Sequence, residues 1–420
     1  MPSPEPVLTE LEARRVVADA ARGPSTSDSN GAHRVGVELE WLAVPLDDSR
    51  GAVRFDALQA TAASLQPLSG GSRITFEPGG QVELSSPALE GLACCTAVSE
   101  DATTLRTALE AAGVALTGIG LAPGGARERV IRTPRYDAME VYFDADGGAG
   151  RTMMRSTAAI QVNLDYGRGE ERERRWRLAH DIGPMLTAAF ANSPLFGGEP
   201  TGWRSTRLAV WFGVDPGRSA PVPRIGTCPD AWASYALDAR VMMVRRSSED
   251  HIPVTDGLGF RSWITDGHPL GWPTRDDLDY HLTTLFPPVR PRGWLELRMI
   301  DALPDPWWRV AVAVCDAVVT EPALDTCVRR ASAPVKNLWR EAARDGLAHP
   351  GLADAARDCF HAAVEVLPSR GADQPTIDAT REFIDRYVDR GRCPADDLLQ
   401  GGWSDGPAHP ALDAVAPAWS

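Results

Sequence analysis

Polar side chains recur at every second position in four short stretches of this 420-residue sequence. In an extended strand successive side chains point to opposite faces, so residues two apart stand on one face, roughly 6 to 7 Å from each other. The alternate positions in each stretch are apolar, which is typical of a strand with one buried face. The polar sets are Glu38 and Glu40; Glu77, Gln81 and Glu83; Gln161, Asn163 and Asp165; and Glu296 and Arg298.

A single Glu-x-Glu pair of this kind usually marks a solvated surface. The four polar faces together carry carboxylates and amides but no Lys, whereas a face built for solubility mixes charges of both signs. We therefore expect the four strands to line one shared concave face. Clustered carboxylates raise one another's pKa unless cations lie between them, and oxygen ligands suit Mg²⁺ or Mn²⁺ rather than zinc. The sequence thus predicts bound divalent metal at this face.

Positive charge next to this face indicates a nucleotide. Mg²⁺ in enzymes commonly bridges protein carboxylates and nucleotide phosphates, so ATP is the natural second ligand, and phosphoryl transfer needs cations on the transferred group. Arg298 stands two residues from Glu296, Arg290 lies just before that strand, and Arg155 lies just before the third strand. Each of these Arg residues alone would be interpreted as a surface residue or half of an ion pair. Beside the acidic face, they are candidates for contacts to phosphate.

Composition and missing motifs exclude several classes of protein. The net charge of -14 repels a phosphate backbone, so nucleic acid is not an expected partner. The sequence has no G-x-x-x-x-G-K-[ST] phosphate loop, strand-linked G-x-G-x-x-G, HExxH or G-x-S-x-G motif. Its seven cysteines form no CxxC pair, which indicates reduced thiols. Because it shows neither a secretory signal nor an apolar run of about 18 residues, we expect a cytoplasmic protein without a membrane span.

The elements that must position the polar residues form an irregular series. We predict strands or hairpins at 34–44, 73–87, 114–123, 156–166 and 293–301, and helices at 6–22, 96–112 and about 170–191. A polar, flexible connection follows the first helix, and a loop rich in Gly and Arg precedes the strand at 156–166. Residues 213–275 are predicted to be long ordered loops over a site, and the chain beyond Pro304 is mostly helical in pattern.

The lack of a regular βαβ alternation favours an α+β fold with a largely antiparallel sheet. We expect an N-terminal helix and connection at 1–30, a single catalytic domain at 31–400 and a C-terminal tail at 401–420. Within the domain, the sheet and the site motifs would span 34–301, and a helical part would span 305–392.

Several longer motifs resemble a known family. GVELEW, FEPGGQVELSS, MRSTAAIQVNLDY, ANSPLFGG, STRLAVW with DPGR, YALD and FPPVRPRGWLELRMID are similar to motifs of the plant-type glutamate-cysteine ligases. Within that family the sequence is most similar to the actinobacterial enzymes of ergothioneine biosynthesis. The motifs span residues 36–301 in the family's order, which makes the resemblance far more specific than any single motif.

The resemblance implies a glutamine-synthetase-like catalytic fold, in which a curved antiparallel sheet forms a funnel that carries metal ions, ATP and glutamate. It implies that Arg298 contacts the transferring phosphate, with Glu296 as its catalytic partner, and that Gln161 and Arg290 lie near the nucleotide. Arg155 and Arg207 would hold the α-carboxylate of glutamate, with Tyr235 near the substrate. The implied Mg²⁺ ligands or their close supports are Glu38, Glu40, Glu77, Glu83, Asn163 and Glu296.

The same resemblance implies the reaction. The γ-phosphate of ATP would move to the side chain of L-glutamate, and the amine of L-cysteine would then displace phosphate to give γ-glutamylcysteine. The chain departs from the family in reading Met299-Ile300-Asp301 where Gly-Ala-Asp is frequent, so the end of that strand is expected to pack differently. Two alternatives stay open: a carboxylate-amine ligase with another acceptor, and a non-catalytic sensor of Mg-nucleotide or amino acid. The residues identify neither the acceptor nor the oligomeric state.

Overall fold

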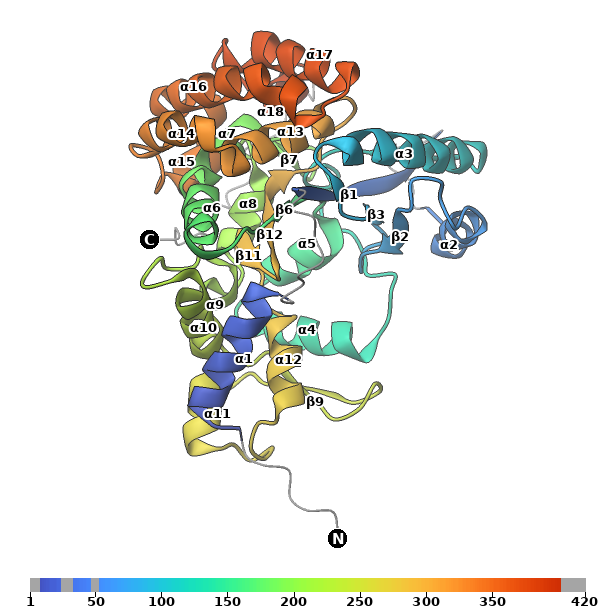
Figure 1. Cartoon of the computed structure of the whole chain (residues 1–420). Coiled ribbons are helices and arrows are strands. Elements are labelled where there is room, and N and C mark those ends of the chain that lie inside the picture. Colours follow the sequence, from blue (N-terminus) through green and yellow to red (C-terminus); the bar gives the residue numbers. More distant parts are fainter. Residues whose placement is uncertain (1–7, 24–32, 47–52, 402–420) are drawn as a thin grey trace.

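The computed structural model describes residues 8–23, 33–46 and 53–401, and its centre is an open sheet of eight strands (Figure 1). The strand order is β11-β12-β6-β1-β3-β2, and β4 and β5 also pair with β1. All of these pairings are antiparallel, which confirms the predicted α+β class. The strands are β1 (Arg34–Pro45), β2 (Arg73–Phe76), β3 (Val82–Ser85), β4 (Leu89–Glu90), β5 (Val114–Thr117), β6 (Ala159–Asp165), β11 (Val289–Pro291) and β12 (Trp294–Asp301).

The central strand, β1, has one face in the core and one face toward a cavity. Val37, Leu39 and Trp41 are at most 1% exposed, whereas Glu38 and Glu40 on the opposite face are only partly buried. This alternation is the reason that the segment forms a strand with two chemically different sides.

The pairing register brings the predicted polar faces onto the same side of the sheet, because directly opposed residues share a face. A register slip of one residue in any strand would turn its polar set into the core. The opposed pairs are Glu38 with Gln161, Glu40 with Glu83, and Asn163 with Glu296.

A layer of helices covers the apolar face of the sheet, at the top of Figure 1. In this layer α13 (Trp307–Thr320) packs on β6 and β1, and its residues 310–315 are fully buried. The predicted helical part beyond Pro304 is therefore confirmed. The layer also holds α3 (Ala93–Ala111), α7 (Gly183–Ala189), α14 (Asp325–Ser332), α15 (Trp339–Asp345), α16 (Pro350–Val366), α17 (Gln374–Phe383) and α18 (Pro394–Gln400), with the short turns η1 (Pro322–Leu324), η2 (Gly346–Ala348), η3 (Leu367–Arg370) and η4 (Ile384–Val388).

A second group of elements faces the polar side of the sheet, and most of them lie in the lower half of Figure 1. Residues from α1, α4, α10 and α12 line the same cavity as Glu38 and Glu40, so these helices close over the strands. The group comprises α1 (Glu10–Arg22), α4 (Pro134–Asp144), α5 (Ala149–Ser156), α8 (Thr206–Phe212), α9 (Pro216–Ser219), α10 (Cys228–Asp238), α11 (Phe260–Asp266), α12 (Arg275–Leu282) and the hairpin of β9 (Met243–Arg245) and β10 (His251–Pro253).

Two predicted loop regions are wrong. The segment at 213–275 contains three helices and a hairpin, and the Gly- and Arg-rich segment before β6 contains α4 and α5. The signals were local: Thr133 and Thr227 each accept a hydrogen bond from the first turn of the helix that follows, and Pro stands in that first turn. High Pro and Gly content concealed these helix starts.

Other predicted boundaries shift. The helix predicted at about 170–191 is broken at Ile182 into α6 (Gly169–Asp181) and α7, which has Pro184 in its first turn. The strand predicted at 114–123 ends at Thr117. The next residue, Gly118, lies close to the backbone at Leu303, since a Cβ on it would lie 2.3 Å from the Leu303 carbonyl oxygen. Three short elements complete the described chain, namely α2 (Phe55–Ser64), β7 (Leu195–Phe196) and β8 (Glu199–Pro200).

The first helix begins at Glu10 in the structure. Residues 6–7 of the predicted helix, most of the connection after it and nearly all of the predicted tail at 401–420 lie outside the described residues. Within the described ranges, no helix is both long and apolar enough to cross a membrane.

Candidate active site

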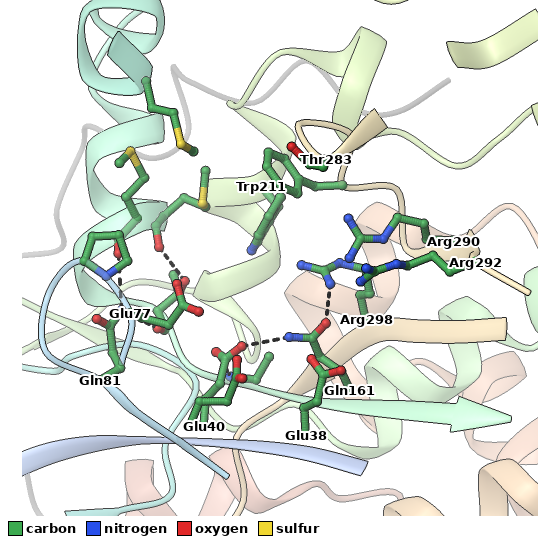
Figure 2. Close-up of a pocket in the computed structure, with 18 of the residues that line it drawn as sticks. Glu38, Glu40, Glu77, Gln81, Gln161, Trp211, Thr283, Arg290, Arg292 and Arg298 are labelled. Atoms are coloured by element: carbon green, nitrogen blue, oxygen red, sulfur yellow. Dashed lines mark hydrogen bonds between the residues drawn. The ribbon is translucent and has the colours of Figure 1, made fainter. Parts of the chain in front are cut away.

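A cavity of about 520 Å³ lies between the polar face of the sheet and the helices that close over it (Figure 2). This volume is within the usual range for a small-molecule site. Nine predicted polar or charged residues reach its wall, from five separate segments of the chain. They are Glu38, Glu40, Glu77, Gln81, Glu83, Gln161, Arg207, Arg290 and Arg298.

Glu38 and Glu40 form the floor, and β6 fixes their orientation. The two carboxylate oxygens of Glu40 accept from the backbone N–H of Ala159 at 2.8 Å and from Nε2 of Gln161 at 2.9 Å. Oε1 of Glu38 accepts from Nδ2 of Asn163 at 3.1 Å. Each floor carboxylate is thus held by a hydrogen bond from the neighbouring strand.

The β2–β3 hairpin brings Glu77, Gln81 and Glu83 to the same floor. Its turn needs glycine, because a Cβ on Gly79 would lie 2.0 Å from the Arg155 carbonyl oxygen. Gln81 locks the turn by accepting from the backbone N–H of Gly79 at 2.9 Å and donating to the Thr157 carbonyl at 2.8 Å. The hairpin is therefore docked against the segment between α5 and β6.

Burial and mutual repulsion keep part of this floor protonated near neutral pH. Burial raises the pKa of Glu40 to about 7, and the charge on Glu83 adds to the effect. Burial, followed by repulsion from Glu40 and Glu83, raises the pKa of Glu77 to about 8. The pKa of Glu38 is also raised, by burial and by the charges on Glu296 and Glu83. A cation at this floor would favour the ionised carboxylates.

Opposite the floor, Arg290 and Arg298 form a positively charged wall around Glu296. Arg290 binds Glu296 in a bidentate manner, at 2.5 and 3.0 Å, and Nη1 of Arg298 donates to Glu296 at 3.2 Å. Burial would raise the pKa of Glu296, but the guanidinium groups of Arg290, Arg298 and Arg292 outweigh it and lower the pKa to about 2. Arg298 also donates to Oε1 of Gln161, which joins the wall to the floor (Figure 2).

Arg207 enters the cavity from α8 and is 3% exposed. Its Nη2 donates to the Arg298 carbonyl at 2.9 Å, and its Nη1 lies 3.7 Å from Oδ1 of Asp301. Asp301 also accepts from the hydroxyls of Ser193 and Ser205, which connects the end of β12 to the start of α8.

The structure does not bring every predicted site residue to the cavity wall. Glu296 lies behind the arginines, and Asn163 lies behind Glu38 with its Oδ1 accepting from Nε1 of Trp294 at 2.9 Å. The guanidinium of Arg155 is paired with Glu140, and the hydroxyl of Tyr235 donates to the Ala220 carbonyl at 3.1 Å. Tyr235 instead stacks on Trp232, which does line the cavity.

The cavity wall also contains residues that sequence reasoning did not single out. They are mostly apolar and come from helices whose starts were predicted as loops. Four of them had a usable signal, since Met154, Trp211, Phe286 and Arg292 lie inside the motifs that carry the family resemblance. The additional lining residues include Tyr136, Met139, Met153, Met154, Trp211, Trp232, Phe286 and Arg292.

A divalent cation fits this floor by the chemistry of its donors. Carboxylate oxygens are the ligands that Mg²⁺ and Mn²⁺ prefer. The pKa values of Glu38, Glu40 and Glu77 are raised first by burial and then by repulsion from other carboxylates, and a cation would offset both effects. In the part of the chain that the structure describes, no group of three or more His, Cys, Asp and Glu side chains is already gathered to hold a metal ion.

The fold of this chain is similar to that of a solved ligase. A solved glutamate-cysteine ligase from Francisella tularensis, in complex with AMP, superimposes with a TM-score of 0.52 over 91% of this chain and 86% of that chain. At 13% identity this similarity shows the fold alone.

Relatives that are similar in sequence identify the family. The chain is 42% identical over 372 residues to glutamate-cysteine ligase EgtA of Mycolicibacterium smegmatis, covering 87% of this chain and 86% of the relative. It is 31% identical over 442 residues to the chloroplastic glutamate-cysteine ligase of Arabidopsis thaliana, covering 94% of this chain and 82% of the relative. The model of glutamate-cysteine ligase family 2 (GCS2) matches residues 34–416. The chain belongs to this family, which confirms the resemblance and the predicted enzyme class.

Proposed function

We propose that the protein joins the γ-carboxylate of L-glutamate to the amine of L-cysteine, with conversion of ATP to ADP and phosphate. The observation that carries the proposal is that one cavity holds carboxylates from β1 and the β2–β3 hairpin opposite Arg298, in a chain of family 2. Relatives that carry the name glutamate-cysteine ligase match over most of their length. The product is γ-glutamylcysteine, which we further propose serves ergothioneine biosynthesis.

The reaction has two steps, since a free carboxylate does not react with an amine. An oxygen of the glutamate γ-carboxylate attacks the γ-phosphorus of ATP, and the bond from that phosphorus to ADP breaks. The amine of cysteine then attacks the carbonyl carbon of γ-glutamyl phosphate, the amide bond forms, phosphate leaves, and the amine loses a proton. The protein contributes mainly position and charge.

The arginine wall is the proposed site of the transferring phosphate. Arg298 lines the cavity and carries its charge next to Gln161, so it can neutralise negative charge on the transferred group. Arg290 supports the same charge, and Gln161 lies at the nucleotide side. Glu296 acts in this arrangement by holding both guanidinium groups in place.

The acidic floor is the proposed metal site. Glu38, Glu40, Glu77 and Glu83 would hold Mg²⁺ or Mn²⁺, with Asn163 orienting Glu38, and Glu296 is retained as a predicted support. Bound metal supplies positive charge to the phosphates of ATP. Without a cation, the floor would repel the anionic substrates.

Glutamate is the proposed ligand of Arg207, whose buried guanidinium suits an α-carboxylate. Arg155 and Tyr235 stay predictions for the same substrate, and the structure gives both of them protein partners. A cytoplasmic location and the absence of nucleic acid partners also stay predictions.

Mass detection of γ-glutamylcysteine from glutamate, cysteine, ATP and Mg²⁺ tests the proposal, with omission of each component as the control. A parallel screen of amine acceptors, followed by ADP release, tests cysteine. Strong preference for another amine would replace cysteine in the proposal, and ATP binding without turnover on any acceptor would favour a sensor.

A further inference from the structure

One turn of α8 presents buried hydrogen-bond donors that the described residues do not satisfy. Arg207 and Trp211 lie four residues apart on this helix, so their side chains share a face. Among the described residues, none accepts a hydrogen bond from Nε or Nη1 of Arg207 or from the indole Nε1 of Trp211. Arg207 is 3% exposed and Trp211 is 9% exposed. Each buried donor without a partner costs the free energy of its lost hydration.

These donors converge on one place. Arg207 and Trp211 both line the large cavity and a small recess of about 10 Å³ that adjoins it. The guanidinium carbon of Arg207 lies 6.0 Å from the centre of the Trp211 ring. In Figure 2 the nitrogen end of Trp211 points from above toward the labelled carboxylates and arginines.

The chemistry of this donor set indicates a carboxylate. A planar carboxylate has two oxygens, so it can accept from a guanidinium and from a second N–H at the same time. Nη1 of Arg207 lies 3.7 Å from Asp301, beyond hydrogen-bond distance, so the positive charge is partly available to a ligand. The indole N–H is a neutral donor with no other use in its apolar setting against Phe286.

We propose that the indole N–H of Trp211 donates, beside Arg207, to the α-carboxylate of the bound amino-acid substrate. Given the proposed function, which this inference rests on, that substrate is glutamate. Trp211 is then a residue that selects an α-amino acid over a simple carboxylic acid, since a ligand without an α-carboxylate leaves both donors unmet.

The test is Trp211→Phe, which removes the N–H and keeps an aromatic ring. Loss of a hydrogen bond to a charged group is expected to raise the KM for glutamate about tenfold, with kcat and the KM for ATP nearly unchanged. Trp263→Phe is the matched control, because Nε1 of Trp263 donates to the Gly271 carbonyl at 2.8 Å and Trp263 does not line the cavity. Thermal unfolding checks that each variant is folded, and Trp211→Leu, which also lacks a donor, replaces the Phe variant if that one is not.

The second arm uses 4-aminobutyrate, which keeps the reacting carboxylate and lacks the α-carboxylate. The variant and the wild type are expected to use it equally poorly, so the roughly tenfold difference disappears. Three results would each overturn the role of Trp211. The KM for glutamate could be unchanged in the folded variant, the variant could lose as much activity on 4-aminobutyrate as on glutamate, or only the KM for ATP could change. If the wild type makes no γ-glutamylcysteine, the proposed function fails instead, and the two results are distinguishable.

Discussion

At the scale of single residues, the pKa of each carboxyl group at the site depends on its surroundings. Glu77 and Glu296 are both buried glutamates near the same cavity, yet the pKa of Glu77 is raised to about 8 and that of Glu296 is lowered to about 2. Glu77 is surrounded by other carboxylates, whereas Glu296 is surrounded by three guanidinium groups. Residue type alone therefore does not determine charge at this site.

Arg298→Ala is expected to reduce ADP release that depends on both glutamate and cysteine by at least about a hundredfold, because a cation on the transferring phosphate is lost. The measurement is coupled ADP release at saturating substrates, with circular dichroism to confirm folding. Arg15→Ala, at a position whose side chain is 84% exposed, is the control. Near-normal turnover of a folded Arg298→Ala enzyme would contradict the assignment.

The raised pKa of Glu77 also predicts that the stability of the protein depends on pH. Its pKa rises from the usual 4.5 to about 8 on folding, so the folded state holds a proton that the unfolded state releases, and stability falls as pH rises between these values. In metal-free buffer, Glu77→Gln is expected to abolish this contribution and to raise the Tm relative to the wild type at pH 8 but not at pH 4.5. Glu100→Gln on α3 is the matched control, and a Tm difference that does not vary with pH would speak against the shift.

At the scale of elements, the connection between β12 and α8 decides where Arg207 points. Asp301, at the end of β12, accepts from the backbone N–H of Asn192 at 2.9 Å and from the hydroxyls of Ser193 and Ser205 at 2.7 and 2.9 Å. The hydroxyl of Ser205 in turn accepts from Leu208 N–H in the first turn of α8. One buried carboxylate thus joins a strand end to a helix start.

Asp301→Ala is expected to destabilise the protein by about 3–5 kcal/mol, because it leaves Arg207 as a buried charge without its counterion. It should also raise the KM for glutamate, since α8 loses its anchor. Chemical denaturation and initial-rate kinetics measure the two effects. Asp301→Asn also removes the charge but keeps the shape and part of the hydrogen bonding, so it isolates the loss of the counterion. A negligible loss in Asp301→Asn would mean that the charge of Asp301 has no role.

At the scale of the whole molecule, the sheet and the C-terminal helices share one core. The largest cluster of buried apolar residues includes Val37 of β1, Ile160 of β6 and Val314 of α13. The helical part therefore covers the same strands whose other faces carry the site, and the single domain at 31–400 stays a prediction.

A shared core predicts one cooperative unfolding transition. Far-UV circular dichroism, which follows the helices, and tryptophan fluorescence should give coincident denaturation curves. Val314→Ala, which opens a cavity in α13, should shift both curves equally, by about 2 kcal/mol. Two separate unfolding transitions, of which the substitution shifts only one, would mean that the predicted domain consists of two independently unfolding parts.

The sequence by itself determined the fold class and most of the acidic floor, and family motifs identified the enzyme class. The period of two in β1, β6 and β12 is a local property of the chain, so the polar faces and their strands could be predicted. Helices α4 and α10 were missed because their Pro- and Gly-rich flanks resemble loops, although their Thr caps are local signals.

Only the tertiary structure decided which polar residues share a cavity and which are paired within the protein. Glu296 and Arg155 carry the same residue types as their neighbours at the wall, but Glu296 is enclosed by arginines and Arg155 is paired with Glu140. These partners lie on other segments of the chain or depend on the direction in which a side chain points. A sequence pattern contains neither kind of information. Trp211 became a candidate for substrate binding for the same reason, since an unmet indole donor is visible only once everything around it is placed.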